Sequence, residues 1–360
     1  MDFFVFIAIV MLFCIVIDTF THQGQYFREA FILWVLCILI FISGFRSGGV
    51  DYDGYKFIYE SVPDISEFFE SYDLLSSIHG ELGFLLLNSL VKFIFDGFYI
   101  VLLVMAILSC VLLVNVSRTY SCLPLLSIYI YYTRFFIDRD IAQIRSGLAA
   151  LIVVYGIKYI IKKDFLKYFC VILCATLFHK VAIIAGVLYF IRDRYLSSKY
   201  ITMLLLLSYF IGVLLPVDDY IIPILMMTDL DFFNNYIGSS YADELGAFYI
   251  VTIYQLLVIG VCMLIGVGRN NNYERIIYNT YICSTMWLMI FSKLGIFAGR
   301  VATIFTTVEM FLIPYIIYSI SNKYTRCICL IIAVAIYLFM MILKVDSRSV
   351  TYDNFIFHVF

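Results

Sequence analysis

The stretch Thr133–Lys180, TRFFIDRDIAQIRSGLAALIVVYGIKYIIKKDFLKYFCVILCATLFHK, decides how this chain folds. It holds two apolar runs, 141–157 and 165–178, which are separated by the basic segment Lys158–Lys167 and flanked by charged residues at their far ends. An ionisable group at the mouth of a membrane span is costly unless a partner, water or a ligand compensates it. The stretch therefore predicts two membrane-spanning helices that bring charged side chains together on one side of the membrane.

The composition of the whole chain extends this prediction. Of the 360 residues, 64% are hydrophobic and only 14% are charged, and the mean hydropathy is +0.99. A water-soluble core could not hide that much apolar surface, so we expect an all-α, polytopic integral membrane helical bundle that forms one transmembrane domain over residues 1–360. The net charge of −2 gives no reason to expect a nucleic-acid partner. The ten cysteines lie almost entirely in apolar runs, and we interpret them as small core residues rather than disulfides or metal ligands.

Apolar runs predict about twelve spans. They cover residues 3–17, 30–45, 98–116, 122–137, 141–157, 165–178, 181–191, 201–215, 248–267, 276–292, 301–320 and 327–343. Some are shorter than the roughly 20 residues that a helix needs to cross a bilayer. The span boundaries predicted from the sequence are therefore approximate.

The distribution of charge predicts the orientation. Six short loops hold 13 Lys and Arg against five Asp and Glu: 18–29, 117–121, 158–167, 192–199, 268–275 and 322–326. The segment Val217–Ala247 holds six acids and no Lys or Arg. The positive-inside rule places the basic loops in the cytoplasm and the acidic segment outside. All six basic loops lie inside only if Glu81–Phe95 does not cross, so we expect an interfacial or re-entrant helix there and both chain termini outside.

Two long segments are expected on the outer face. Residues 46–97 begin with a glycine turn, Ser47–Gly49, and continue as short amphipathic helices lying on the membrane surface. Residues 216–247 form the acidic outer loop.

The first candidate binding residues lie at the start of the first outer segment. Arg46 is followed by two glycines, Asp51, Asp53 and Tyr55. Glycines beside an arginine allow backbone N–H groups to face an anion. A tight loop that closes a helical hairpin would explain the same residues.

Further candidates lie at predicted span mouths. Glu81 begins the interfacial helix, where it could also be a favourable first-turn acid. Arg139 and Arg145 are six residues apart and so lie on different faces of a helix, with Arg145 deeper in the span. Asp138 and Asp140 could simply neutralise Arg139.

Two more candidates lie farther along the chain. His179 lies between two spans, where a solvated loop histidine is the alternative. Arg300 begins the predicted 301–320 span, where a snorkelling anchor is the alternative. No metal-binding motif and no Walker-type glycine loop occurs, so we expect no metal site, no cofactor and no nucleotide-driven pump. Arginines on one face suit a phosphate or pyrophosphate bound bidentately.

At these residues the chain resembles the EpsG family, within the wider Wzy-type O-antigen and exopolysaccharide polymerases. Five ordered segments carry the resemblance: FRSGGVDYDGY (45–55), HGELGFLLL (79–87), DIAQIRSGLAALIV (140–153), TLFHKVAIIAGVLY (176–189) and FAGRVATIFTTVEMFLIP (297–314). They span nearly the whole chain, and their order carries more specificity than any one of them. Ser146 stands where the family usually has Gln, and Lys180 where it has a small polar residue.

The resemblance implies a metal-independent glycosyltransferase of GT-C-like architecture in the bacterial inner membrane. Its implied partners are undecaprenyl-pyrophosphate-linked oligosaccharides as donor and acceptor, membrane lipid and a chain-length regulator protein. Polymerisation would take place on the periplasmic face.

On this reading, Arg145 and Arg300 stabilise the leaving pyrophosphate, since its charge grows as the glycosidic bond breaks. Candidates for the base that activates the acceptor hydroxyl are Asp51, Glu81 and His179. Candidates for substrate binding are Arg46, Asp53, Tyr55 and Arg139.

Two other functions fit a polytopic protein of this kind. A flippase for lipid-linked oligosaccharides would need charged groups near the bilayer midplane and often has an internal repeat, which we do not find in the sequence. A membrane sugar acyltransferase would need a catalytic histidine deep in a span, whereas His179 is predicted at an outer edge.

The orientation can be tested with reporter fusions. Reporters placed after Ile160 and Asn270 are expected in the cytoplasm, and reporters placed after Asp64 and Ser239 are expected outside. Alkaline phosphatase, which is active only outside, and a fluorescent protein that matures only inside give opposite readouts. A cytoplasmic signal at Asp64 together with an outside signal at Ile160 would reverse the predicted map.

Overall fold

The computed structural model describes residues 2–21, 25–95, 97–191, 194–215, 249–269 and 271–347, with a few residues between 217 and 223. The secondary-structure elements in these ranges are all helices, which confirms the all-α prediction. The acidic segment 216–247 falls almost wholly outside the described residues, as do both chain termini, whose predicted position is therefore not described.

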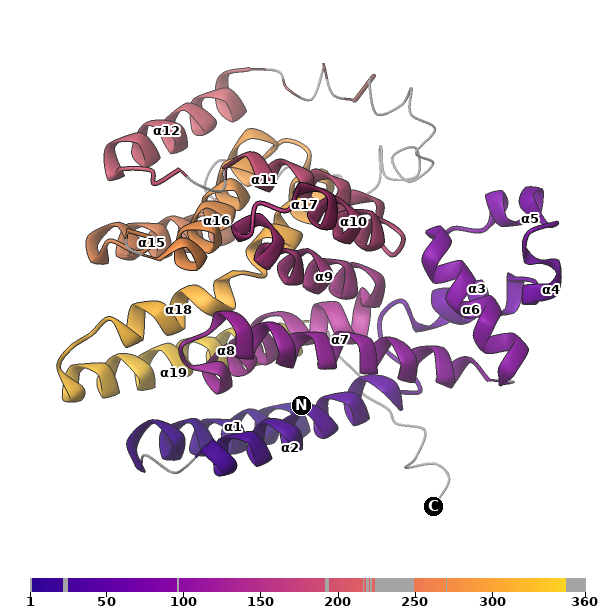
Figure 1. Cartoon of the computed structure of the whole chain (residues 1–360), viewed down its shortest axis with the longest axis horizontal. Coiled ribbons are helices and arrows are strands. Elements are labelled where there is room, and N and C mark those ends of the chain that lie inside the picture. Colours follow the sequence, from indigo (N-terminus) through magenta and orange to yellow (C-terminus); the bar gives the residue numbers. More distant parts are fainter. Residues whose placement is uncertain are drawn as a thin grey trace.

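The long helices run side by side in one bundle, and four short helices gather at one end of it (Figure 1). The bundle contains α1 (Asp2–Thr21), α2 (Gln25–Gly44), α7 (Phe98–Tyr120), α8 (Pro124–Tyr131), η1 (Tyr132–Ala142), α9 (Ile144–Ile161), α10 (Phe165–Thr176), η2 (Lys180–Val187), α11 (Leu188–Ile191), α12 (Ser198–Leu214), α15 (Ile250–Ile265), α16 (Asn272–Ile290), α17 (Gly295–Thr306), α18 (Glu309–Tyr318) and α19 (Lys323–Ser347). The short helices are α3 (Tyr52–Ser61), α4 (Ile65–Phe68), α5 (Tyr72–Ser77) and α6 (Leu82–Ile94).

Four of the described helices are long and apolar enough to cross a membrane: α2, α7, α9 and α19. The pair α17 and α18 also passes that test together. These helices support an integral membrane protein, while the number of twelve spans stays a prediction. The helix α9 is the most buried of the four, with 67% of its span inside the protein, whereas α19 has 28% inside and lies at the edge.

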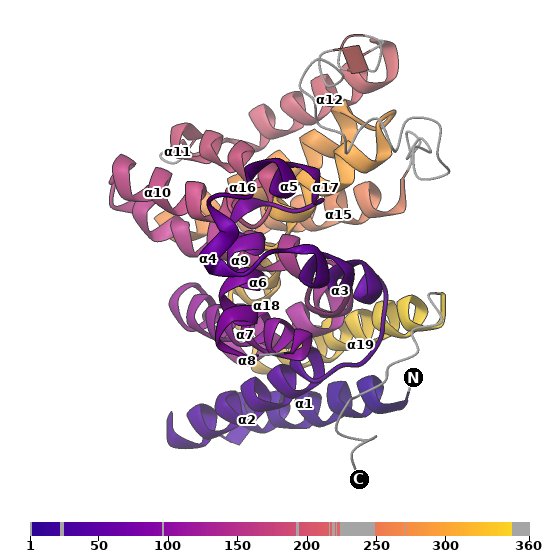
Figure 2. The ribbon, with the colours of Figure 1, turned by 90° about the vertical axis from the view of Figure 1, so that its right-hand side faces the viewer.

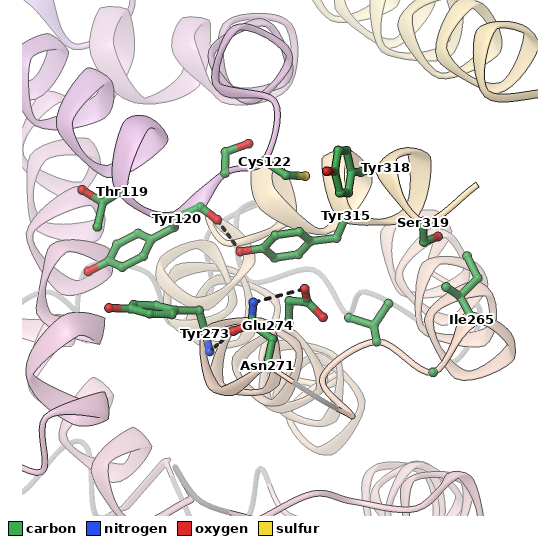
Figure 3. A pocket seen from close by; sticks show the side chains of 13 residues that line it. Thr119, Tyr120, Cys122, Ile265, Asn271, Tyr273, Glu274, Tyr315, Tyr318 and Ser319 are labelled. Carbon is green, nitrogen blue, oxygen red and sulfur yellow. Dashed lines mark hydrogen bonds between the residues drawn. The ribbon is translucent and has the colours of Figure 1, made fainter. Parts of the chain in front are cut away.

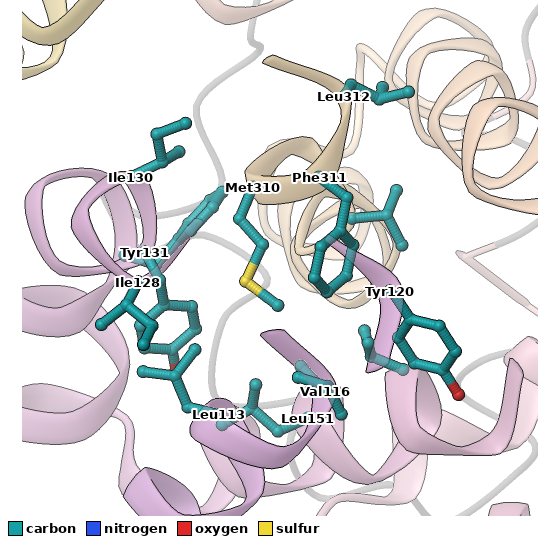
Figure 4. Packing of buried hydrophobic residues seen from close by; sticks show 14 of the residues in the cluster. Leu113, Val116, Tyr120, Ile128, Ile130, Tyr131, Leu151, Met310, Phe311 and Leu312 are labelled. Atoms are coloured by element: carbon teal, nitrogen blue, oxygen red, sulfur yellow. The ribbon is translucent and has the colours of Figure 1, made fainter. Parts of the chain in front are cut away.

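The core forms where α7, α8, α9 and α18 meet, and Figure 4 shows Leu113 and Val116 facing Met310 and Phe311 there. Buried tyrosines join these helices to their neighbours through backbone carbonyls. Tyr129 donates to the carbonyl of Val334. In an apolar surrounding such bonds satisfy hydroxyl groups that have no access to water.

Three predicted spans differ from the observed helices. The predicted 122–137 span is longer than expected. The helix α8 is followed without interruption by the π-helix η1, which ends at Ala142. The 301–320 span is broken between α17 and α18, which meet at a bend of 44°. The 181–191 span is a short 3₁₀-helix, η2, followed by one turn of α-helix. In the first two cases buried charged side chains, described below, find their partners inside the bundle at these places.

The helix α6 lies with α3 and α4 at the end of the bundle and packs on the start of α7 (Figure 2). Its 13 residues are shorter than a membrane crossing needs. The interfacial position predicted for Glu81–Phe95 remains a proposal that this arrangement supports.

Candidate active site

Glu81, Arg145 and His179 meet at the end of the bundle that carries α3–α6. Nη1 of Arg145 donates to Oε2 of Glu81 at 2.5 Å. Nδ1 of His179 lies 3.3 Å from Oε1 of the same carboxylate. These residues come from the N-terminus of α6, the first turn of α9 and the connection between α10 and η2. The sequence places these three residues in a larger group expected on one face, and the fold brings these three into contact while Arg139 has other partners.

A close contact between α6 and the end of α10 makes this meeting possible. The backbone N–H of Gly83 donates to the carbonyl of Leu177 at 2.9 Å. A Cβ atom at Gly83 would lie 2.7 Å from Cβ of Leu177 and 2.8 Å from its carbonyl oxygen, so no larger residue fits there without displacement. Gly83 follows Glu81 by two residues, and Leu177 precedes His179 by two. The contact therefore sets the distance between the carboxylate and the imidazole.

Glu81 is held as a carboxylate. Burial alone would raise its pKa, but the hydrogen bond to His179 and the positive charge of Arg145 outweigh burial and lower the pKa to about 2. Glu81 is therefore ionised at any physiological pH and is a weak base.

The charge of Glu81 determines the tautomer of His179. An ionised carboxylate only accepts hydrogen bonds, so Nδ1 of His179 must carry the proton that it shares with Oε1. Nε2 then carries the lone pair in the neutral ring. That atom is buried and has no hydrogen-bond partner among the described residues. The arrangement presents one basic nitrogen whose orientation is fixed by a carboxylate.

Arg145 is enclosed by aromatic rings as well as by Glu81. Its guanidinium carbon lies 5.6 Å from the ring centre of Tyr55 and 5.5 Å from that of Phe84. Tyr55 is itself buried, on the inner face of α3. The aromatic surround and the carboxylate compensate the cost of an arginine near the bundle interior.

Arg300 lies in the middle of α17, rather than at the start of a span as predicted. The positive charge of Arg300 acts on His79, which lies in the loop before Glu81. The pKa of His79 is lowered by partial burial and the charge of Arg145, and the charge of Arg300 lowers it further. Arg300 therefore contributes positive potential beside the Glu81–Arg145–His179 cluster.

The remaining predicted residues are not part of this hydrogen-bonded cluster. Asp51 and Asp53 are exposed, and Asp51 has a left-handed backbone (φ 63°) just before α3. Arg46 is buried and donates from Nη1 to the carbonyl of Gly48, which fits a residue that holds the glycine turn. Arg139 is buried, and it donates to Thr303 in α17 and to Thr307 directly after that helix.

The two acids beside Arg139 have other direct partners. Asp138 accepts from Nζ of Lys344 at 2.5 Å, and Asp140 accepts from the hydroxyl of Tyr131 at 2.8 Å. Neither acid forms a salt bridge with Arg139 among the described residues.

Sequence reasoning missed a second buried charge cluster, around Glu309 at the start of α18. Its carboxylate is fully buried and accepts from the hydroxyls of Tyr281 (2.8 Å) and Tyr337 (2.9 Å). Nε of Arg134 lies 3.7 Å from it. A lone acid within the apolar run 301–320 was the signal that could have found this cluster, because such a residue in a span needs an internal partner.

The comparisons with known proteins agree with the resemblance. The EpsG family model matches residues 29–357. The chain belongs to the EpsG family. Amylovoran biosynthesis protein AmsC of Erwinia amylovora is 24% identical over 220 residues, which cover 58% of this chain and 56% of AmsC. The match thus spans little more than half the length of that curated relative. No solved structure matches the chain.

A cavity of about 390 Å³ opens elsewhere in this EpsG-family protein, between the end of α7 and the start of α16 (Figure 3). A helix as long as α7 measures roughly 35 Å, and α6 adjoins its other end, so this cavity is remote from Glu81. Glu274 on its wall accepts from the amide of Asn271, which caps α16. The contact with this capping residue accounts for the presence of Glu274 on the cavity wall. We therefore do not include the cavity in the candidate active site.

Substituting Gly83 tests whether the α6–α10 contact sets the site. Gly83→Ala should force α6 away from Leu177, separate Glu81 from His179 and reduce activity by roughly 10²-fold, the scale for a misplacement of about 1 Å. Gly54→Ala is the matched control, since a Cβ there meets nothing within 4 Å. The readout is the amount and length of surface polysaccharide in cells that contain equal amounts of each variant, because the EpsG-family relative takes part in polysaccharide biosynthesis. Equal chain lengths in the two variants would show that the contact is unimportant for the site.

Proposed function

We propose that this EpsG-family protein is a glycosyltransferase-like polymerase of polysaccharide biosynthesis. The observation that carries the proposal is the Glu81–His179 pair, which presents a buried basic nitrogen beside Arg145. Family membership and the similarity to a protein of amylovoran biosynthesis support it.

The proposed donor is an oligosaccharide repeat on undecaprenyl pyrophosphate, and the proposed acceptor is a sugar hydroxyl of a second lipid-linked unit. We place the reaction on the periplasmic face of the bacterial inner membrane, because the charge distribution orients the end with α3–α6 outward. Metal independence is part of the proposal. The Arg145 and Arg300 side chains would take the charge-stabilising role at the pyrophosphate.

His179 is the proposed base. Nε2 takes the proton of the acceptor hydroxyl as its oxygen bonds to the anomeric carbon of the donor. The bond from that carbon to the pyrophosphate oxygen breaks, and the pyrophosphate leaves with the electron pair. Glu81 stabilises the imidazolium that forms. A single inverting displacement fits best, since a retaining route needs a nucleophilic carboxylate and Glu81 is already bonded to Arg145 and His179.

A lipid-linked oligosaccharide flippase is the second candidate. One observation favours it: the Arg134–Glu309 pair lies at a broken helix within the bundle, an arrangement that transport proteins use near the membrane midplane.

A strain that lacks the gene for this protein distinguishes the polymerase from the flippase. Loss of a polymerase should leave surface glycan that carries single repeat units. Loss of a flippase should leave no surface glycan, with lipid-linked precursor trapped on the cytoplasmic side. Gel electrophoresis of the surface glycan and extraction of the lipid-linked precursor measure the two outcomes, and the second would reject the polymerase.

The base is tested by complementing the deletion strain with His179→Gln. Removal of a general base should slow polymerisation by about 10²–10⁴-fold, so that surface glycan stays at single repeats. His79→Gln is the matched control, because His79 is a nearby histidine that makes no hydrogen bond to Glu81 and lies at the partly exposed rim of the cluster. Long glycan chains in the His179→Gln strain would remove His179 from the reaction.

The two arginines are tested by conversion to lysine, which keeps the charge but loses the fork of N–H donors. Arg145→Lys and Arg300→Lys should leave normal protein levels in the membrane and reduce polymerisation by roughly 10²–10³-fold. Normal chain lengths in either variant would exclude that arginine from pyrophosphate stabilisation. Loss of the protein itself would assign the arginine to folding.

A further inference from the structure

The π-helix η1 places two arginines on one face. In an α-helix, residues five apart point about 140° away from each other. A π-helix closes i→i+5 hydrogen bonds, as the bond from Gln143 N–H to the Asp138 carbonyl shows, and residues five apart then lie roughly above one another. Arg134 and Arg139 are five apart in η1. Both reach the same feature, the break between α17 and α18.

Arg139 holds the end of α17 before the break. Its Nη2 donates to the carbonyl of Thr303 and its Nη1 to the hydroxyl of Thr307, both at 2.5 Å. The last carbonyls of a helix lack partners within the helix, and a cation is favourable at that end. The guanidinium also packs 4.1 Å from the ring centre of Phe135. With 3% of its surface exposed, Arg139 is enclosed by these contacts.

Arg134 acts on the other side of the break. It faces Glu309, the first residue of α18, where a negative charge is favourable. Each side of the break therefore carries one charged contact from η1. The bend is defined by specific contacts with η1 rather than by a proline or glycine, because the only proline of α18 is Pro314, farther along the helix.

Arg300 lies on the face of α17 that Arg139 holds. Arg300, Thr303 and Thr307 are spaced at i, i+3 and i+7, which places them along one side of the helix. The helix that carries Arg145 begins directly after η1 and touches it closely. A Cβ atom at Gly147 of α9 would lie 2.9 Å from the carbonyl oxygen of Arg139. The single element η1 thus contacts both helices that carry the proposed pyrophosphate-binding arginines.

We propose that Arg139 is a positioning residue, which fixes Arg300 relative to Arg145 by tying the last turn of α17 to η1. It acts through Thr303 and Thr307 and does not itself contact the substrate, in contrast to the role suggested by the sequence. This inference rests on the proposed function of Arg300 in holding an anionic leaving group.

Thr307→Val tests the link without removing a charge. Valine keeps the shape but cannot accept the hydrogen bond from Arg139. Misplacement of Arg300 should lower kcat by about tenfold to a hundredfold and leave KM nearly unchanged. Thr303→Val is the matched control, because the Thr303 hydroxyl donates to Gly299 of its own helix while Arg139 uses only its carbonyl. Rates are measured on the purified full chain in lipid vesicles, with lipid-linked repeat units extracted from the deletion strain.

Arg139→Lys is the second variant and should reproduce the fall in kcat. A raised KM in Arg139→Lys together with an unchanged Thr307→Val would show that Arg139 contacts the substrate, and would overturn the inference. Thermal unfolding of each variant is measured alongside. Activity losses that match the loss of folded protein would assign the contact to folding alone and would also overturn it.

Combining Thr307→Val with Arg300→Lys separates this inference from the proposed function. If Arg139 acts through Arg300, the double variant should be about as slow as Arg300→Lys alone, since the two changes remove the same contribution. Losses that multiply would overturn the positioning role while leaving the proposed function intact. An Arg300→Lys variant with full activity would reject the role of Arg300 and the positioning inference with it.

Discussion

The constraint on which this structure depends is that a charge buried among apolar helices needs a partner. Leaving one member of a buried ion pair without the other costs about 3–5 kcal/mol. The chain meets this constraint with pairs that join distant segments. Glu81 and Arg145 are 64 residues apart, and the half-buried pair Asp138 and Lys344 is 206 residues apart. The buried charges thereby fix which helices are neighbours, a choice that apolar packing in lipid leaves weakly determined.

The sequence predicted the helical membrane class, and it placed Glu81, Arg145 and His179 within a larger set of charged groups expected on one face, for a simple physical reason. Apolar runs mark the helices, and charges at their ends mark one face. The sequence could not predict which groups would pair. Glu81 was one of several candidate bases, and only the contact at Gly83 shows that it faces both His179 and Arg145. Asp51 offered the same chemistry but lies exposed.

The π-helix and the break of the 301–320 span were beyond sequence reasoning. The residues of η1 carry no glycine or proline that would signal an unusual helix, and neither do the residues between α17 and α18. Both features follow from tertiary contacts of Arg134 and Arg139 with helices far along the chain. A π-helix is rare, and no residue of this stretch signals one, so its tertiary partners are the feature that accounts for it. Lone charges within apolar runs were the visible signal.

Glu81 can serve both a base and an anion-binding arginine because its two oxygens are used separately. Oε2 accepts from Arg145, while Oε1 faces His179 and the backbone N–H of Lys180. The ion pair keeps Glu81 ionised, which keeps Nδ1 of His179 protonated and leaves the lone pair on Nε2. A guanidinium has five N–H donors, and Glu81 engages Nη1 alone. Under the proposed function, one buried carboxylate therefore orders the base and leaves the Nε2 lone pair available. The same carboxylate holds the arginine in place without using all of its N–H donors.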